Sequence, residues 1–363
     1  MKAVVVEKVN EYAVQDVQLD SPKAGEVRVK IKAAGVCHSD LSVINGTIPL
    51  AVMGPLVLGH EGAGIIEELG EGVQGLAVGD HVALSWVYMC GDCYYCDRHQ
   101  DHLCQEGSKS FGKMLDGTAR VHRDGKDLNT MLLTGCMAEQ AIVPAANCVR
   151  IDKDIPFTVA AMVGCGVVTG VGAAIKTAGV TPGSTVAVIG CGGIGLSIIQ
   201  GAKIAGAKMV IAIDQAPNKL EMAKKFGATH AFLADEAADK VKKLTKGIGV
   251  DFGFEAVGIA ATVKAMDLLT RRGGTATVVG VGSMLKSFDF NALAFSMTGK
   301  TYKGCFYGNA FPKVDFPMLL GFYKSGKLDL DNMISKTYTI DQVKEAFADM
   351  EAGSNARGII VFD

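Results

Sequence analysis

The 363-residue sequence lacks any strong imbalance of charge. Its 36 lysines and arginines face 38 aspartates and glutamates, which leaves a formal net charge of −2. No long basic stretch occurs, so electrostatic capture of nucleic acid or of an anionic membrane is not expected. The opening residues, MKAVVVEKVNEY, contain an apolar run too short for a secretory signal peptide and too soon followed by charge. We therefore expect a cytoplasmic protein.

Two stretches lack charged residues over about the length of a membrane span. They run over residues 155–175 and 177–202. Both are rich in glycine, and Pro182 interrupts the second. These features favour buried core segments over membrane-spanning helices, so no membrane partner is expected.

Disulfides are not expected, although the chain has ten cysteines. A disulfide-framed secreted domain is usually much shorter and carries a signal peptide. Four cysteines instead crowd into one short segment, with the spacing Cys90-x2-Cys93-x2-Cys96-x7-Cys104. Four thiolates on one loop can close a tetrahedral shell, which is typical of a structural zinc site. An iron–sulfur cluster is the alternative metal group, and an unliganded loop is the alternative without metal.

The pattern of short elements changes partway along the chain. Residues 1 to about 165 read as short strands separated by glycine, with no long helical period, which predicts a mostly β domain. From Thr185 onward, strands and helices alternate five times, which predicts a doubly wound parallel sheet and an α/β fold. The length of the chain fits two or three domains. Two helices, near 312–324 and 341–352, and a last strand, 358–362, are expected to follow.

A glycine-rich loop lies between the first strand and the first helix of this alternation. It reads Gly190-Cys191-Gly192-Gly193-Ile194-Gly195 and fits the dinucleotide-binding pattern in its required context. The glycines let the backbone approach a pyrophosphate, and the helix N-terminus favours its negative charge. Asp214 ends the next strand, where a carboxylate binds a ribose diol and repels a 2′-phosphate. NAD is therefore the predicted cofactor.

Three further residues could form a second zinc site. Cys37, His60 and Cys165 supply two thiolates and an imidazole, and they leave a fourth position for water or an alcohol oxygen. Such an open site is catalytic. The spacing along the chain does not show that the three residues meet in space, and each one alone is equally compatible with a place in the core.

Together these residues resemble the zinc-dependent medium-chain alcohol dehydrogenases over essentially the whole chain. The resemblance rests on Gly59-His60-Glu61, the four-cysteine loop, Gly164-Cys165-Gly166, the glycine loop and Arg357-Gly358-Ile359. The segment Asp116–Arg120 is similar to that of longer, typically dimeric members, so a homodimer or homotetramer is expected. The family implies a GroES-like catalytic domain over residues 1–166, completed by 307–363, and a Rossmann NAD-binding domain over 167–306.

The resemblance also implies roles for individual residues. Cys37, His60 and Cys165 would hold the catalytic zinc, with Glu61 behind the metal and Asp40 orienting His60. Ser39 would hydrogen-bond the substrate hydroxyl, and Trp86 would line the substrate pocket. The expected cofactor-binding residues are His38, Thr169, Gly190, Gly192, Gly193, Ile194, Gly195, Asp214, Lys219 and Arg357, of which His38 and Arg357 would face the pyrophosphate.

Two departures from the family pattern bear on the substrate. Some members have a histidine, the end of a proton relay, where this chain has Ser42. Members that act on glutathione adducts use an acid in the loop before the zinc histidine and an arginine after the fourth loop cysteine. Here residues 47–53 contain no acid, and Ser108 stands at the arginine position.

The sequence therefore predicts an oxidoreductase that transfers hydride between an alcohol and NAD with the help of zinc. Trp86, Ile48, Leu50 and Met53 would form an apolar pocket for cyclic, benzylic or allylic alcohols, or would instead pack a lid or a dimer contact. Two alternatives remain open: a glutathione-dependent formaldehyde dehydrogenase, and a zinc-stabilised NAD-binding protein without catalysis.

Overall fold

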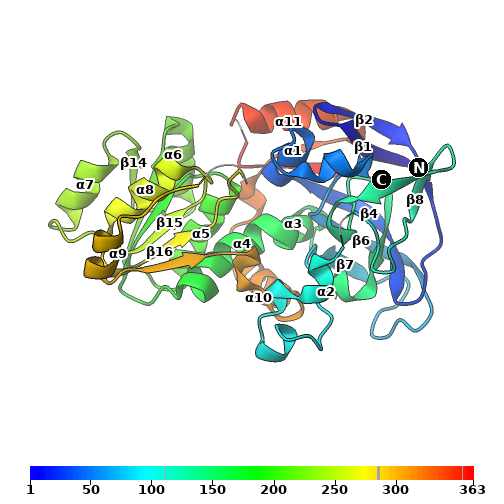
Figure 1. Ribbon diagram of the computed structural model, residues 1–363, viewed down its shortest axis with the longest axis horizontal. Helices are drawn as coiled ribbons and strands as arrows, with labels where there is room; N and C mark the ends of the chain where they lie inside the picture. The colour runs from blue at the N-terminus through cyan, green and yellow to red at the C-terminus, as the bar shows by residue number, and fades with distance from the viewer. Residues whose placement is uncertain (111, 284–286, 354) are drawn as a thin grey trace. The chain divides into compact units, whose positions relative to one another are not determined.

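The computed structural model describes residues 1–110, 112–283, 287–353 and 355–363, which fold into two compact units. The first unit contains Met1–Cys165, Phe311–Ser325 and Leu330–Asp363. The second unit contains Gly166–Ala310 and Gly326–Asp329. Figure 1 labels the helices and strands of both units.

The second unit is built on a six-stranded sheet in the order β14-β13-β12-β15-β16-β17, and all neighbouring strands are parallel. The chain order reverses between β12 and β15, where α/β proteins of this type bind their ligands. The predicted doubly wound sheet is confirmed. Its strands are β12 (Thr185–Ile189), β13 (Met209–Asp214), β14 (His230–Leu233), β15 (Val250–Glu255), β16 (Thr270–Val278) and β17 (Thr301–Gly304).

Helices connect these strands and cover the sheet. They are α5 (Gly193–Ile204), α6 (Pro217–Lys225), α7 (Ala237–Leu244), α8 (Ala260–Leu269) and α9 (Ala292–Thr298). Neither α9 nor the sixth strand, β17, was expected from the sequence. The reason is that β17 reads Thr-Tyr-Lys-Gly and is largely exposed at the sheet edge, so it has no continuous apolar run.

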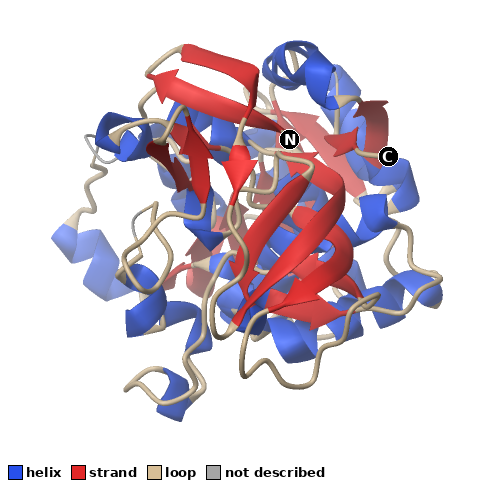
Figure 2. Cartoon of the chain, turned by 90° about the vertical axis from the view of Figure 1, so that its right-hand side faces the viewer, coloured by secondary structure: helices blue, strands red, loops and turns tan. Residues whose placement is uncertain are grey.

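The first unit is mostly β structure, as predicted (Figure 2). Its central strand is β4 (Glu26–Val36), which alternates buried and half-buried residues before becoming fully buried. Around β4 the sheet has the order β11-β7-β6-β4-β19-β18, and a second sheet has the order β2-β1-β5-β9-β8-β3. The other strands of the β4 sheet include β6 (Gly62–Leu69), β7 (His81–Leu84), β18 (Ile334–Tyr338) and β19 (Arg357–Val361).

The described part of the first unit also contains eight further strands and four further α-helices outside the long helical segment Phe157–Ala178. The other strands are β1 (Lys2–Lys8), β2 (Glu11–Asp16), β3 (Gln18–Leu19), β5 (Leu56–Val57), β8 (Val121–Arg123), β9 (Lys126–Thr130), β10 (Gln140–Pro144) and β11 (Cys148–Arg150). The helices are α1 (His38–Ile44), α2 (Gln105–Ser108), α10 (Pro312–Lys324) and α11 (Val343–Glu351). Strand β19 pairs with both β4 and β18, so the end of the chain closes the first unit.

One long helical segment was not predicted. It runs over Phe157–Ala178 and comprises α3 (Phe157–Met162), α4 (Val168–Gly172) and two π-helical turns. Its length and apolar composition would suit a membrane span, but 89% of its most apolar window is buried inside the protein. A helix buried on all sides has no amphipathic period, which explains why this helix could not be predicted from its apolar pattern.

Candidate functional site

The structure brings Cys37, His60, Glu61 and Cys165 together in the first unit. One ligand atom from each lies within 4.8 Å of the others, and all four residues are buried. Cys37 precedes α1, His60 and Glu61 precede β6, and Cys165 lies in the π-helical turn Val163–Val167. Three separate segments therefore supply one compact donor set of two thiols, an imidazole and a carboxylate.

Asp40 fixes the orientation of the His60 ring. Its Oδ1 accepts a hydrogen bond from the Gly59 backbone N–H at 3.0 Å and lies 3.3 Å from His60 Nδ1. His60 Nε2 is buried and has no hydrogen-bond partner in the described part of the chain. An orphaned imidazole nitrogen beside two buried thiols fits a zinc ion, because zinc takes His nitrogen and Cys sulfur as ligands.

The electrostatics of the set favour a thiolate. A hydrogen bond with Cys165 lowers the pKa of Cys37 well below its usual value, and the charge of His60 adds to this against the effect of burial. The same hydrogen bond and burial raise the pKa of Cys165. Burial lowers the pKa of His60, but Asp40 and Cys37 outweigh it and raise that pKa to about 10. Thiolate is the form of cysteine that binds metal.

Within this donor set, Glu61 also forms a buried ion pair that was not predicted from the sequence. Glu61 Oε2 accepts a hydrogen bond from Arg357 Nη2, and both side chains are almost fully buried. The two residues are 296 positions apart, so no local pattern could have linked them. The resemblance had assigned Arg357 to the cofactor pyrophosphate, and the structure adds Glu61 as its partner on the zinc side.

The residues expected on the substrate side occupy different environments. Trp86 lies edge-on to His60, with ring centroids 6.4 Å apart, and is half-buried. His38 and Ser39 begin α1, where His38 is exposed and Ser39 half-buried.

The apolar loop before β5 only partly matches the expected pocket. Ile48 and Leu50 pack against the hydrophobic core of the first unit, while Val52 and Met53 are exposed. Ile48 and Leu50 are only partly buried in this contact, so their place in a substrate pocket, a lid or a dimer contact stays a prediction.

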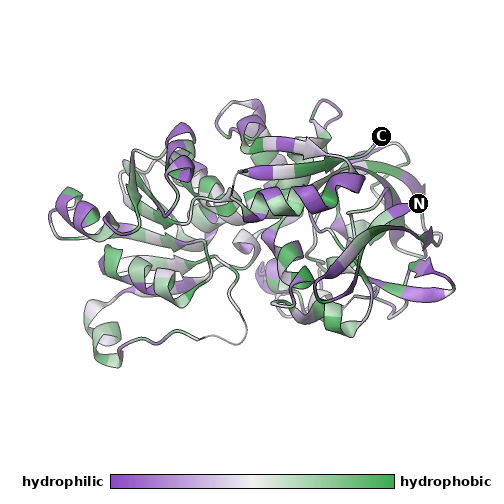
Figure 3. Cartoon of the chain, turned by 90° about the horizontal axis from the view of Figure 1, so that it is seen from above, coloured by the Kyte–Doolittle hydropathy of each residue, from purple (hydrophilic) through white to green (hydrophobic). Residues whose placement is uncertain are grey.

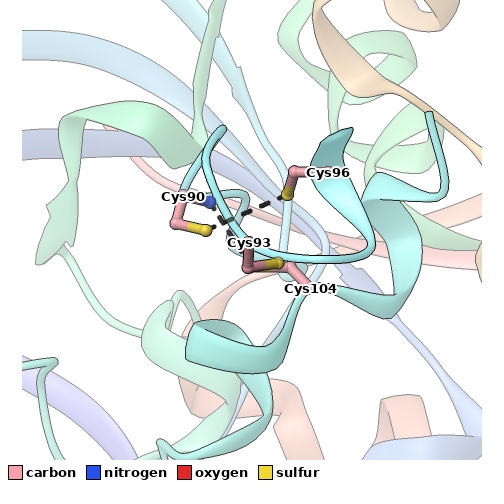
Figure 4. Close-up of side chains that lie close together, drawn as sticks. All are labelled: Cys90, Cys93, Cys96 and Cys104. Atoms are coloured by element: carbon pink, nitrogen blue, oxygen red, sulfur yellow. Dashed lines mark hydrogen bonds between the residues drawn. The ribbon is translucent and has the colours of Figure 1, made fainter. Parts of the chain in front are cut away.

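The four-cysteine loop forms the second donor set of this unit (Figure 4). The sulfur atoms of Cys90, Cys93, Cys96 and Cys104 lie within 4.8 Å of one another, and the Cys90 and Cys96 sulfurs are 4.0 Å apart. Backbone N–H groups of Cys96 and Gln105 lower the pKa of Cys93 to about 6. Four converging sulfurs, one of them already acidic, fit a closed zinc shell.

The glycine loop of the second unit has the geometry that a pyrophosphate requires. Gly192 caps α5, and a Cβ atom added there would meet nothing within 4 Å, so the backbone is open to a ligand. Gly195 has the opposite constraint, because a Cβ there would lie 1.8 Å from the Gly190 carbonyl oxygen. Gly193 and Ile194 are the first two residues of α5.

Asp214 lies at the end of β13, as predicted, and is tied to the glycine loop. Its Oδ2 accepts a hydrogen bond from the Cys191 N–H at 2.8 Å, and its Oδ1 accepts one from the Ala216 N–H at 3.0 Å. These contacts hold the carboxylate beside the loop, where a ribose diol can reach its remaining lone pairs. The other two expected cofactor residues of this unit are Thr169, buried in α4, and Lys219, half-buried in α6.

Glu255 is a further buried carboxylate of the second unit, and the sequence analysis missed it. It ends β15, and its Oε1 accepts hydrogen bonds from the Val257 and Gly258 N–H groups and from Thr262. It thereby shapes the loop beside the glycine turn, since a Cβ on Gly190 would meet Val257 at 2.6 Å. The signal available in the sequence was an acidic residue at the carboxyl end of a predicted apolar strand.

Two protein-family models match the chain and together cover more than half of it. Residues 23–153 match the alcohol dehydrogenase GroES-like domain, and residues 193–325 match the zinc-binding dehydrogenase domain. The GroES-like fold expected for the first unit is thereby confirmed.

Similar proteins span nearly the full chain. An NDMA-dependent alcohol dehydrogenase from Amycolatopsis methanolica is 40% identical over 96% of this chain and 95% of its own, and alcohol dehydrogenase B from Mycobacterium tuberculosis is 37% identical over 96% and 94%. The crystal structure of a benzyl alcohol dehydrogenase from Acinetobacter calcoaceticus matches with a TM-score of 0.93 and 32% identity, covering 100% of this chain and 99% of that one. The chain therefore belongs to the zinc-dependent medium-chain alcohol dehydrogenases.

Proposed function

We propose that this alcohol dehydrogenase transfers hydride reversibly between a primary or secondary alcohol and NAD at the Cys37–His60–Cys165 site. The observation that carries the proposal is this buried donor set, with the unpartnered Nε2 of His60 facing two thiols. Cys37, His60 and Cys165 would hold a zinc ion that supplies Lewis acidity toward the alcohol oxygen, and bound NAD would supply the hydride acceptor.

Individual residues of the chain are assigned to metal binding, proton transfer and water exclusion. Cys37, His60 and Cys165 bind the metal, and Asp40 keeps His60 in the tautomer that presents Nε2. Ser39 receives the proton of the substrate hydroxyl and passes it outward, with Ser42 in the position where some relatives have a histidine. Trp86 lies beside His60, where its ring excludes water.

The second unit carries the residues proposed to bind the dinucleotide. The open backbone at Gly192 and the N-terminus of α5 receive the pyrophosphate, and Asp214 receives the ribose. Asp214→Gly should weaken NAD use by about 10- to 100-fold and relax the preference toward NADP, because a charged hydrogen bond and its repulsion of the 2′-phosphate are lost. Kinetics of the unmodified enzyme that favour NADP would contradict this assignment.

The electron acceptor has a second candidate, because one relative is described as NDMA-dependent. Alcohol oxidation should therefore be measured with NAD alone, with NDMA alone and with both. Turnover with NAD alone supports the proposal. Turnover that requires NDMA supports an activity like that of the relative.

For the substrate we propose an apolar alcohol that is cyclic, benzylic or allylic. Trp86 beside His60 offers an aromatic wall, and the segment Thr47–Met53 offers no charge to pair with a charged tail. Each methylene that leaves water contributes about 0.8 kcal/mol to binding, whereas an unpaired buried charge is costly. A relative of known structure is described as a benzyl alcohol dehydrogenase, which is consistent with this class.

The test is to compare catalytic efficiency for ethanol, benzyl alcohol, a cyclohexenol and a glutathione adduct. Benzyl alcohol or the cyclohexenol should rank first, and Trp86→Ala should change that ranking more than it changes NAD binding. Ethanol ranking first would contradict the apolar pocket. Strict dependence on glutathione would select the glutathione-dependent formaldehyde dehydrogenase.

Metal analysis separates an enzyme from a non-catalytic zinc- and NAD-binding protein. We propose two zinc ions per chain, one in each donor set. One zinc per chain, located on the four-cysteine loop, would indicate a structural remnant.

We further propose a homodimer or homotetramer located in the cytoplasm. In the second unit, α9, which precedes the edge strand β17, exposes Leu293, Phe295 and Met297 and is coloured largely as hydrophobic in Figure 3. Apolar patches of this kind mark protein contacts. Light scattering that finds only monomers at micromolar concentration would contradict the proposal.

A further inference from the structure

Tyr338 is a buried tyrosine with a doubly bonded hydroxyl in the first unit. It ends β18 and is 1% exposed. Its hydroxyl donates a hydrogen bond to Asp349 Oδ2 on α11 at 2.7 Å and accepts one from Asn355 Nδ2 at 2.7 Å. The hydroxyl therefore links α11 to the segment that leads into β19.

The ring of Tyr338 and its neighbours in β18 hold the other side of that segment. A Cβ atom on Gly358 would lie 2.9 Å from Cε2 of Tyr338, so the ring packs directly on the backbone of β19. The Ala356 N–H donates to Ser335 Oγ at 2.8 Å. Asn355, Ala356 and Gly358, which flank Arg357, are thus all fixed by residues of β18.

Arg357 in turn reaches the zinc-ligand set. Its guanidinium pairs with Glu61, whose carboxylate oxygen lies within 4.8 Å of the ligand atoms of Cys37, His60 and Cys165. The connection is continuous from the Tyr338 hydroxyl through the backbone around Arg357 to Glu61. A shift of β19 would move the guanidinium and release Glu61 toward or away from the metal.

We infer that Tyr338 is a positioning residue of this enzyme: its hydroxyl and ring fix Arg357, and Arg357 fixes Glu61 beside the catalytic zinc. The inference rests on the proposed zinc site. It assigns no contact between Tyr338 and substrate. A tyrosine that merely stabilised the fold would add its effect to that of any change at Arg357, whereas a positioning residue acts only while Arg357 is present.

The experiment is a double-mutant cycle with Tyr338→Phe, Arg357→Ala and the double variant. Tyr323→Phe is the control, because the Tyr323 hydroxyl also contacts an aspartate, Asp331, in the same unit, at an exposed position outside β18 and β19. Two readouts are measured: kcat and KM for benzyl alcohol, and the visible spectrum of enzyme carrying Co(II) at the catalytic site. The spectrum reports metal coordination without requiring turnover.

Tyr338→Phe should lower kcat by about three- to tenfold with little change in KM for benzyl alcohol, and Arg357→Ala should lower kcat by about 10- to 100-fold. The double variant should match Arg357→Ala, and the Co(II) spectra of both single variants should shift in the same direction. Tyr323→Phe should stay within about twofold of the unmodified enzyme.

Additive losses in the double variant, or an unchanged Co(II) spectrum in Tyr338→Phe, would overturn the inference. If Arg357→Ala fails to fold, Glu61→Gln replaces it in the cycle, with the same expectation of no added loss. An unmodified chain that binds Co(II) at this site but oxidises no alcohol would count against the proposed function, while the spectral comparison would still decide the role of Tyr338.

Discussion

The two donor sets of the first unit use similar atoms in different ways. The four-cysteine set takes its ligands from one loop between Cys90 and Cys104, and two of its residues are only half-buried. The catalytic set takes its ligands from segments as far apart as Cys37 and Cys165, all of them buried. Asp40 and the Glu61–Arg357 ion pair support the catalytic set. We expect the local closed shell to serve folding and the dispersed, supported set to serve chemistry.

The sharpest test of this contrast is Cys37→Ser. Loss of one thiolate should remove the catalytic zinc and lower kcat by at least about a thousandfold, because the Lewis acid contributes several kcal/mol to the reaction. Zinc content should fall from two ions to one while the melting temperature changes little. Elemental analysis, alcohol oxidation and thermal unfolding measure the three effects, and an active variant with one zinc would contradict the assignment.

Cys93→Ser probes the other set and should show the reverse pattern. The structural zinc contributes to folding directly, so its loss should destabilise the protein by at least about 3 kcal/mol and lower the melting temperature by about 10 °C. The folded fraction should retain the catalytic zinc and turn over substrate. A variant that loses activity without losing stability would reverse the roles of the two sets.

Asp40→Asn should have a smaller effect that is specific to the supported set. The substitution keeps the shape of the side chain but weakens its hold on His60 Nδ1, so catalytic efficiency or zinc affinity should fall by about 10- to 100-fold. Steady-state kinetics and competition with a zinc chelator measure both quantities. Asp92→Asn, next to the four-cysteine set, is the control and should change neither by more than about twofold.

The smallest expected effect concerns the acidity of Cys93. After zinc is removed by chelation, Cys93 should be largely thiolate above its pKa of about 6. Its alkylation by iodoacetamide should therefore be about tenfold slower at pH 5 than at pH 7. Cys148, whose pKa burial raises to about 12, should stay unreactive at both values. Mass spectrometry of labelled peptides measures the rates, and a flat pH profile for Cys93 would contradict the prediction.

The same contrast explains which parts of the fold and of the two donor sets could be predicted from the sequence. The spacing of Cys90, Cys93, Cys96 and Cys104 and the glycine loop are local patterns, and each predicted its site directly. The strands and helices between 185 and 278 were predictable because their apolar periodicity is strong. Arg357 and Glu61 carry no such signal, because the pairings of β19 and of β6 with β4 bring them together.

The buried helix and the loop before β5 show where prediction from residue type fails. Phe157–Ala178 is apolar on all sides, so its sequence has no period that distinguishes a helix from a strand. Ile48 and Leu50 are apolar, which suits a pocket wall, and the structure also packs them, partly buried, against the core. Residue type alone does not separate these two uses.

The position of β19 has a consequence for how the protein is made. This strand lies between β4 and β18 in its sheet, yet β4 begins at Glu26 and β19 only at Arg357. Domains fold largely as the chain leaves the ribosome. The second unit can therefore fold while synthesis continues, but the first unit waits until Arg357 has emerged, leaving the edge of β4 without its partner and Glu61 without its counter-ion. Chaperones that shield strand edges during translation should accordingly bind nascent chains of the first unit until this last strand is in place.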